Sequence, residues 1–169
     1  MKKLLVVVLA VLTILSAASC QPSGGGKGAP ESENLEGSLE DILSKIYETA
    51  DVSDNFREWA KSGLETKDIT AENVEYHLGT SDIEYEDAIT SEPLMMPSAY
   101  SLCLLRLKEG ADVEQIKSLL KEKADPRKWI CVGVDPENVY VDSIGDVVMV
   151  VMSDEAGEAL HNAFLALKG

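Results

Sequence analysis

The chain has 169 residues, with 15 basic and 30 acidic side chains, and its formal net charge is −15. An acidic chain is repelled by phosphate, which argues against nucleic acid as a partner and against electrostatic docking to anionic lipid. About 130 residues follow the N-terminal segments described next, enough for one domain with a core but too few for two.

The N-terminus has the three parts of a secretory signal peptide. Two lysines follow Met1, an apolar run extends from Leu4 to Leu15, and small residues lead up to Cys20. The run is well short of the ~20 residues that a membrane-spanning helix needs. It also lacks the polar face of a short buried helix. We therefore predict a lipoprotein signal peptide over residues 1–19.

The cysteine that ends this segment has a specific expected role. The residues "AASC" (17–20) resemble the bacterial lipobox, in which the thiol is diacylated and the chain is cut just before the cysteine, although Ala17 stands where leucine is usual. Two acyl chains suffice for stable anchoring, at about 0.8 kcal/mol per buried methylene. We expect Cys20 to be lipidated and to hold the protein on the extracellular face of the cell membrane. The alternative is ordinary cleavage that leaves a free cysteine.

The segment after the signal peptide is rich in glycine, serine and proline. We predict that residues 20–37 form the lipidated cysteine and a flexible tether, and that residues 38–169 form a single domain. Removal of Lys2 and Lys3 with the signal peptide leaves 15 minus 2 basic residues against 30 acidic ones, a net charge of −17. A charge of this size mainly promotes solubility, and it also attracts cations.

Two helices are expected at the start of the domain. Ser38 is suited to cap a helix whose apolar residues from Leu39 to Tyr47 share one face, and Ser53 is suited to cap a shorter helix that ends near Ser62. Residues 70–79 fit a short helix as well as a strand.

The remainder alternates between strands and helices. Strands are expected over 83–91, 99–108, 138–142 and 146–152, and helices are expected from Asp112 to before Pro126 and from a cap at Ser153 onward. The order after residue 80 is ββαββα. With the N-terminal helices, it predicts an α+β domain in which an antiparallel sheet is covered on one face by helices.

Four stretches of this region support a resemblance. They are "YHLG" (76–79), "SEPLMMPSAYSL" (91–102), "DPRKWICVGV" (125–134) and "GDVVMVVM" (145–152). The region resembles uncharacterised surface lipoproteins of Gram-positive anaerobic bacteria, a family known only as a domain of unknown function. The resemblance implies an exported, lipid-anchored protein without an assigned activity, and it transfers no catalytic residue.

The sequence has no catalytic or metal-binding signature. The stretch "GGGKG" (24–28) lacks the Gly-Lys-Ser/Thr ending of a phosphate-binding loop. The two histidines, His77 and His161, have no ligand spacing, and the acidic stretch "DIEYED" (82–87) is typical of a solvated strand edge. We therefore expect no catalytic residue, no metal site and no cofactor.

Cys103 and Cys131 are the thiols that remain once Cys20 is acylated. An even pair in an exported protein permits a disulfide. The interpretation we favour is two buried thiols that act as small apolar residues, because Cys103 falls within a strand and Cys131 within the apolar stretch "WICVGV".

Two features are candidates for contact with a partner. Met95 and Met96 lie between prolines in "EPLMMP", where an exposed pair would form an apolar contact patch or would fold back over the core. Trp129 is suited to anchor a partner or to fill the core. These features favour a non-enzymatic binding or interaction module. The alternatives are a small envelope-associated hydrolase and an accessory subunit of an export or uptake system.

Overall fold

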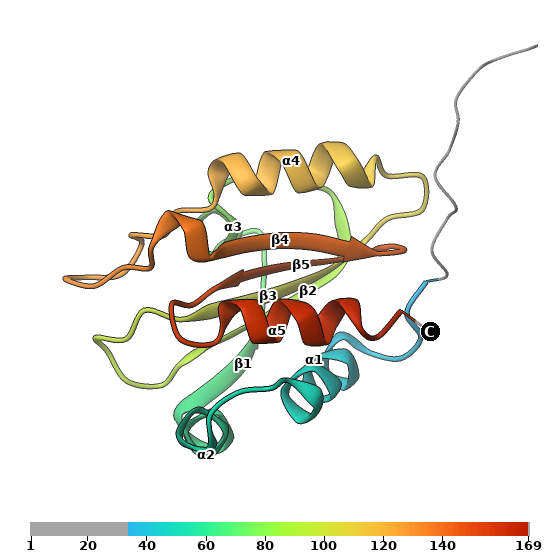
Figure 1. Ribbon diagram of the computed structural model, residues 1–169. Helices are drawn as coiled ribbons and strands as arrows, with labels where there is room; N and C mark the ends of the chain where they lie inside the picture. The colour runs from blue at the N-terminus through green and yellow to red at the C-terminus, as the bar shows by residue number, and fades with distance from the viewer. Residues whose placement is uncertain (1–33, 169) are drawn as a thin grey trace, which may run out of the picture.

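The computed structural model describes residues 34–168, which form a five-stranded antiparallel sheet flanked by five α-helices (Figure 1). The strand order is β1-β2-β3-β5-β4. The strands are β1 (Leu64–Asp68), β2 (Tyr85–Pro93), β3 (Ser101–Leu107), β4 (Val139–Ile144) and β5 (Val147–Met152). The α+β class and the ββαββα order after residue 80 are confirmed, with one 3-10 turn, η1 (Pro136–Asn138), before β4.

The helices are α1 (Leu39–Thr49), α2 (Asp54–Gly63), α3 (Val74–Leu78), α4 (Val113–Lys123) and α5 (Gly157–Leu165). Two expected caps are confirmed: Ser38 accepts a hydrogen bond from the Asp41 backbone N–H, and Ser53 caps α2 in the same way. Asp112, where a helix was expected to begin, is the cap of α4. Such caps satisfy backbone donors that have no partner within the helix.

The helices cover both faces of the sheet, whereas the sequence analysis predicted one covered face. α1, α2 and α5 pack on the face that presents Leu102 and Leu104, and α3 and α4 pack on the face that presents Cys103 and Leu105 (Figure 1). The cause is visible in β3, "SLCLLRL", and in β5, "VVMVVM", which are apolar at both odd and even positions. Strands of this kind need cover on both sides.

Of the two alternatives for residues 70–79, the structure shows the helix, α3. Two local details differ from the sequence-based expectation. β1 was not predicted, because "LETKD" has little apolar alternation. The last helix begins at Gly157, later than expected. Ser153 still accepts a hydrogen bond of 3.1 Å from the Ala156 N–H and so organises the turn before it.

Residues 34–37, the last four residues of the predicted tether, are docked on the domain. Arg106 donates hydrogen bonds to the carbonyl oxygens of Leu35 (3.1 Å) and Gly37 (2.8 Å), and Asn34 accepts one from the Asp146 N–H. The chain therefore enters the domain at the sheet end that holds the β4–β5 turn. Cys20 and the rest of the tether lie outside the described residues.

Candidate functional site

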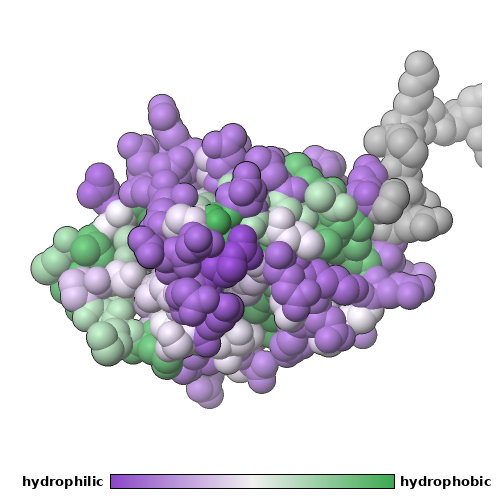
Figure 2. Space-filling model, turned by 60° about the horizontal axis from the view of Figure 1, so that its bottom comes forward, coloured by the Kyte–Doolittle hydropathy of each residue, from purple (hydrophilic) through white to green (hydrophobic). Residues whose placement is uncertain are grey.

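The exposed apolar surface of the described chain gathers at one end of the sheet. All five large hydrophobic side chains that are exposed in residues 34–168 lie in α3, the β2–β3 loop or the α4–β4 loop: Tyr76, Leu94, Met95, Met96 and Ile130. We call this set the apolar loop end. Met95 is 80% exposed and Ile130 is 77% exposed. Figure 2 shows hydrophobic surface on the left, where the two loops of Figure 1 project, and a second hydrophobic area on the right.

Contacts between neighbouring residues show that the three segments are adjacent. The Lys128 ammonium lies 4.8 Å from the centroid of the Tyr76 ring and donates a hydrogen bond of 2.6 Å to Glu92, near the end of β2. Ala99, from the β2–β3 loop, packs in the same small core as Trp129. The apolar loop end is therefore one surface assembled from segments more than fifty residues apart.

The β2–β3 loop projects from stems that are firmly held. The Leu94 N–H donates a hydrogen bond of 2.9 Å to the Gly63 carbonyl oxygen, and the buried Tyr100 hydroxyl lies 2.6 Å from that of Tyr47. With its stems fixed, the loop keeps its two methionines in solvent. Of the two alternatives for Met95 and Met96, the structure shows the exposed pair and not a pair folded back over the core, while their contact with a partner stays a prediction.

Trp129 is a core residue, so of its two expected roles the structure shows the one that fills the core and not the exposed anchor. Its side chain is 5% exposed and packs with Val134 and Met152. The apolar residue of this loop that does face solvent is its neighbour Ile130, which the sequence analysis missed. An apolar run such as "WICVGV" does not reveal which of its members point outward.

The two cysteines are free and have different environments. Cys103 is buried, as expected, and burial raises the pKa of its thiol. Cys131 is exposed, which corrects the expectation of a buried extended segment, and its φ of 65° lies in the left-handed region. The structure shows no disulfide between them.

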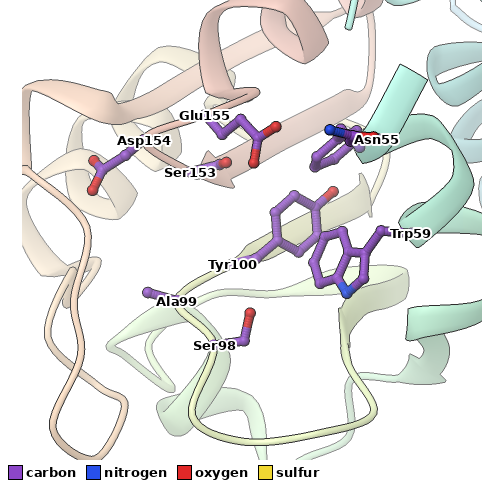
Figure 3. A pocket seen from close by; sticks show the side chains of 9 residues that line it. Asn55, Trp59, Ser98, Ala99, Tyr100, Ser153, Asp154 and Glu155 are labelled. Atoms are coloured by element: carbon purple, nitrogen blue, oxygen red, sulfur yellow. The ribbon is translucent and has the colours of Figure 1, made fainter. Parts of the chain in front are cut away.

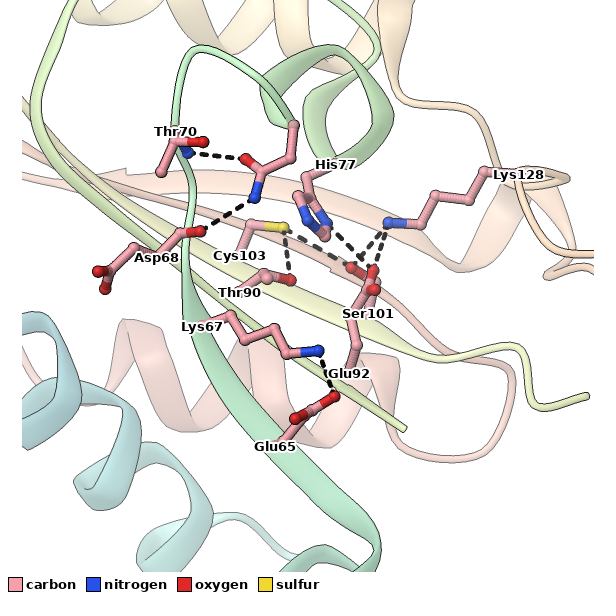
Figure 4. A network of polar contacts seen from close by, with 11 residues as sticks. Glu65, Lys67, Asp68, Thr70, His77, Thr90, Glu92, Ser101, Cys103 and Lys128 are labelled. Atoms are coloured by element: carbon pink, nitrogen blue, oxygen red, sulfur yellow. Dashed lines mark hydrogen bonds and ion pairs between the residues drawn. The ribbon is translucent and has the colours of Figure 1, made fainter. Parts of the chain in front are cut away.

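A buried polar cluster lies directly beneath the apolar loop end (Figure 4). Lys128, whose side chain is 4% exposed, donates hydrogen bonds to Glu92 and to Ser101 Oγ, at 2.6 and 3.2 Å. Cys103 and Thr90 continue this chain of contacts along the sheet. His77 Nδ1 lies 3.4 Å from Glu92 Oε1 but makes no hydrogen bond there, so this is a contact between charges when the imidazole is protonated.

The electrostatics of this cluster keep Glu92 ionised. Burial by itself disfavours the carboxylate, but the nearby His77 ring and the Lys128 ammonium outweigh that effect and lower the pKa of Glu92 to about 2. The distance of 3.2 Å between Lys128 Nζ and Ser101 Oγ is typical of a serine activated by a lysine. However, Ser101 is fully buried and Lys128 is paired with Glu92, so no substrate reaches the hydroxyl in this structure.

A second polar cluster joins β4 to the helices on either side. The Asp142 carboxylate lies 3.1 Å from Lys117 of α4 and 3.2 Å from His161 of α5, and the His161 ring stacks on Tyr140. His161 is half-buried. Desolvation opposes ionisation of Asp142, but the Ser143 N–H and these partners lower its pKa. The cluster ties both helical layers to the edge strand.

Within residues 34–168, no three His, Cys, Asp or Glu side chains are grouped so as to hold a metal ion. In the same residues, no helix combines the length and apolarity needed to cross a bilayer.

No protein family model matches the chain, and comparison with curated proteins and with solved structures found no similar protein. The resemblance to surface lipoproteins therefore stays a prediction.

Proposed function

We propose that this protein is a lipid-anchored interaction module on the outer face of the cytoplasmic membrane, which presents the apolar loop end to a partner protein without catalysing a reaction. The observation that carries the proposal is the position of that surface. All the exposed large hydrophobic side chains of the described chain lie at one end of the sheet, and residues 34–37 enter at the other.

The geometry of β3 gives the separation between these ends. Ser101 contacts the polar cluster beneath the apolar loop end, whereas Arg106 holds the entering chain. Five residues of extended strand separate them by about 17 Å. In a domain tethered through Cys20, the apolar surface therefore lies at the end opposite to the attachment of the tether. Together with a net charge of −17 in the mature chain, this favours a protein partner over the lipid surface.

The runner-up functions are a small envelope-associated hydrolase and an accessory subunit of an export or uptake system. The contact between Ser101 and Lys128 is an arrangement that favours a hydrolase, and the burial of both residues weighs against it. An accessory subunit would use the same apolar surface. It differs from the leading proposal in the identity of its partner.

The anchor is tested by mass spectrometry of the mature protein purified from its native membrane. We expect the first residue to be an acylated Cys20. We expect Cys20→Ala to remain an uncleaved precursor. A mature protein with an unmodified N-terminal cysteine, or one that starts elsewhere, would contradict the anchor.

The contact surface is tested by replacing Met95 and Met96 together with serine. Because both side chains are exposed, we expect the melting temperature to change by no more than about 2 °C. Loss of two central apolar contacts should weaken partner crosslinking on intact cells about tenfold or more. The matched control replaces the exposed pair Lys121 and Glu122 of α4 with serine, and it should leave crosslinking unchanged. A large fall in melting temperature would place the methionines in the core instead.

A further inference from the structure

A pocket of about 420 Å³ opens beside the β2–β3 loop (Figure 3). It lies between the start of α2, the residues that lead into β3, and residues 153–155 before α5. The side chains that matter for recognition are Asn55, Trp59, Tyr100 and Glu155. Its volume is within the range of pockets that hold small ligands, about 300–1,000 Å³.

Two aromatic rings form the apolar side of the pocket. Trp59 and Tyr100 meet edge to face, with ring centroids 5.5 Å apart and an interplanar angle of 89°. The indole also lies against the bare backbone of Gly63, where an added Cβ would stand 2.5 Å from Trp59 Nε1. Tyr100 is 2% exposed and its hydroxyl pairs with Tyr47, so it supports the indole of Trp59 from the core side. Both rings are therefore fixed in place.

A carboxylate and an amide form the polar side. Glu155 Oε1 accepts a hydrogen bond of 3.1 Å from Ser53 Oγ, and Figure 3 shows the Glu155 carboxylate beside Asn55 and above the Tyr100 ring. Asp154 points away from the pocket and accepts bonds from the Asp135 N–H and from Asn138, both at 2.8 Å. Glu155 is thus the carboxylate available to a ligand in the pocket.

We propose that this pocket binds an organic cation, a guanidinium or ammonium group that stacks on Trp59 and pairs with Glu155. An aromatic face and a carboxylate both attract a cation. The N-terminus of α2 opposes this with about half a positive charge, but Asp54 and Glu155 bring two full negative charges to the same region. The acidic protein as a whole also concentrates cations and repels anions.

Two kinds of ligand carry such a cationic group: the arginine or lysine side chain of a protein, and a free polyamine. Two probes distinguish them. Nα-acetyl-arginine amide represents the peptide-borne group, and agmatine represents the free cation. Tighter binding of the first assigns the pocket to a protein ligand, and tighter binding of the second assigns it to a small molecule; either result supports a cation site.

The test is a titration of the isotope-labelled purified protein, followed through the indole N–H resonances of its two tryptophans. We expect the Trp59 resonance to shift with a dissociation constant on the order of 1 mM, while the buried Trp129 resonance stays in place. The neutral isostere Nα-acetyl-citrulline amide should bind at least tenfold more weakly. Glu155→Gln should weaken cation binding about tenfold, and the matched surface change Glu137→Gln should leave it unaltered.

Equal binding of the citrulline and arginine probes would overturn the proposal, and so would an unchanged affinity in Glu155→Gln. A Trp59 resonance that no probe shifts would do the same. The inference stands independently of the apolar loop end, because the serine variants of Met95 and Met96 leave the pocket intact. If those variants lose partner crosslinking but keep cation binding, the two surfaces are separate.

Discussion

Gly79→Ala is expected to lower the free energy of unfolding by about 3–4 kcal/mol and the melting temperature by about 10 °C. Gly79 ends α3 with a φ of 75°, a left-handed conformation that costs an alanine about 1 kcal/mol. The larger part of the effect is steric. An added Cβ would overlap the carbonyl oxygen of Lys123 and stand 2.5 Å from its carbonyl carbon, so the end of α4 would have to move.

Gly110→Ala is the matched control for this prediction. Gly110 has a similar φ of 81°, but an added Cβ there meets no atom within 4 Å. We expect a loss of about 1 kcal/mol, the conformational cost alone. Equal losses in chemical denaturation of the two variants would show that α3 does not approach α4 as closely as described.

Lys128→Met is expected to cost about 3 kcal/mol of unfolding free energy. The methionine keeps much of the packing volume but leaves the Glu92 carboxylate without its ammonium partner beneath the apolar loop end. Glu92→Gln should also lower the free energy of unfolding, because it leaves the charge of Lys128, whose side chain is 4% exposed, without its carboxylate partner. The double variant should regain at least about 1 kcal/mol relative to the sum of the single losses. Additive losses would contradict the coupling.

The same pair gives the protein a defined response to acid. The folded-state pKa of Glu92 is about 2, below the ordinary value of 4.5, so its contribution to stability is complete above pH 4.5 and is lost as the pH falls from 4.5 to 2. Allowing for partial exposure of Glu92, that contribution is on the order of 2 kcal/mol. In Glu92→Gln the fall in stability over this window should be correspondingly smaller. A curve identical to that of the unchanged protein would contradict the assignment.

Local signals in the sequence predicted much of the fold. Caps at Ser38, Ser53 and Asp112, followed by helical apolar spacing, located α1, α2 and α4, and the short link at Gly145 located the β4–β5 hairpin. β1 has no such signal. It joins the sheet through backbone pairing, with Leu64 opposite Pro93 and Asp68 opposite Ile89. Because its side chains are mostly polar, their pattern does not indicate a strand.

The candidate sites were predictable only in part, because they depend on distant pairings. The two flanking prolines marked Met95 and Met96 as unusual but left open whether the pair is exposed or folded over the core. The partnership of Glu92 with Lys128 joins residues 36 positions apart. The pocket combines Trp59, Tyr100 and Glu155 from three elements, and no local pattern in the sequence brings them together. Such sites require the sheet order and register before they can be recognised.

The central claim is that the apolar loop end, and not the tethered end, meets a partner protein. Its most direct test places a photoreactive amino acid singly at Met95, at Ile130 or, as the tether-end control, at exposed Glu109, followed by irradiation of intact cells. We predict that the probes at positions 95 and 130 crosslink to the same protein and that the probe at 109 does not. Crosslinking of 95 and 130 to lipid, or equal protein crosslinking from all three positions, would contradict the account.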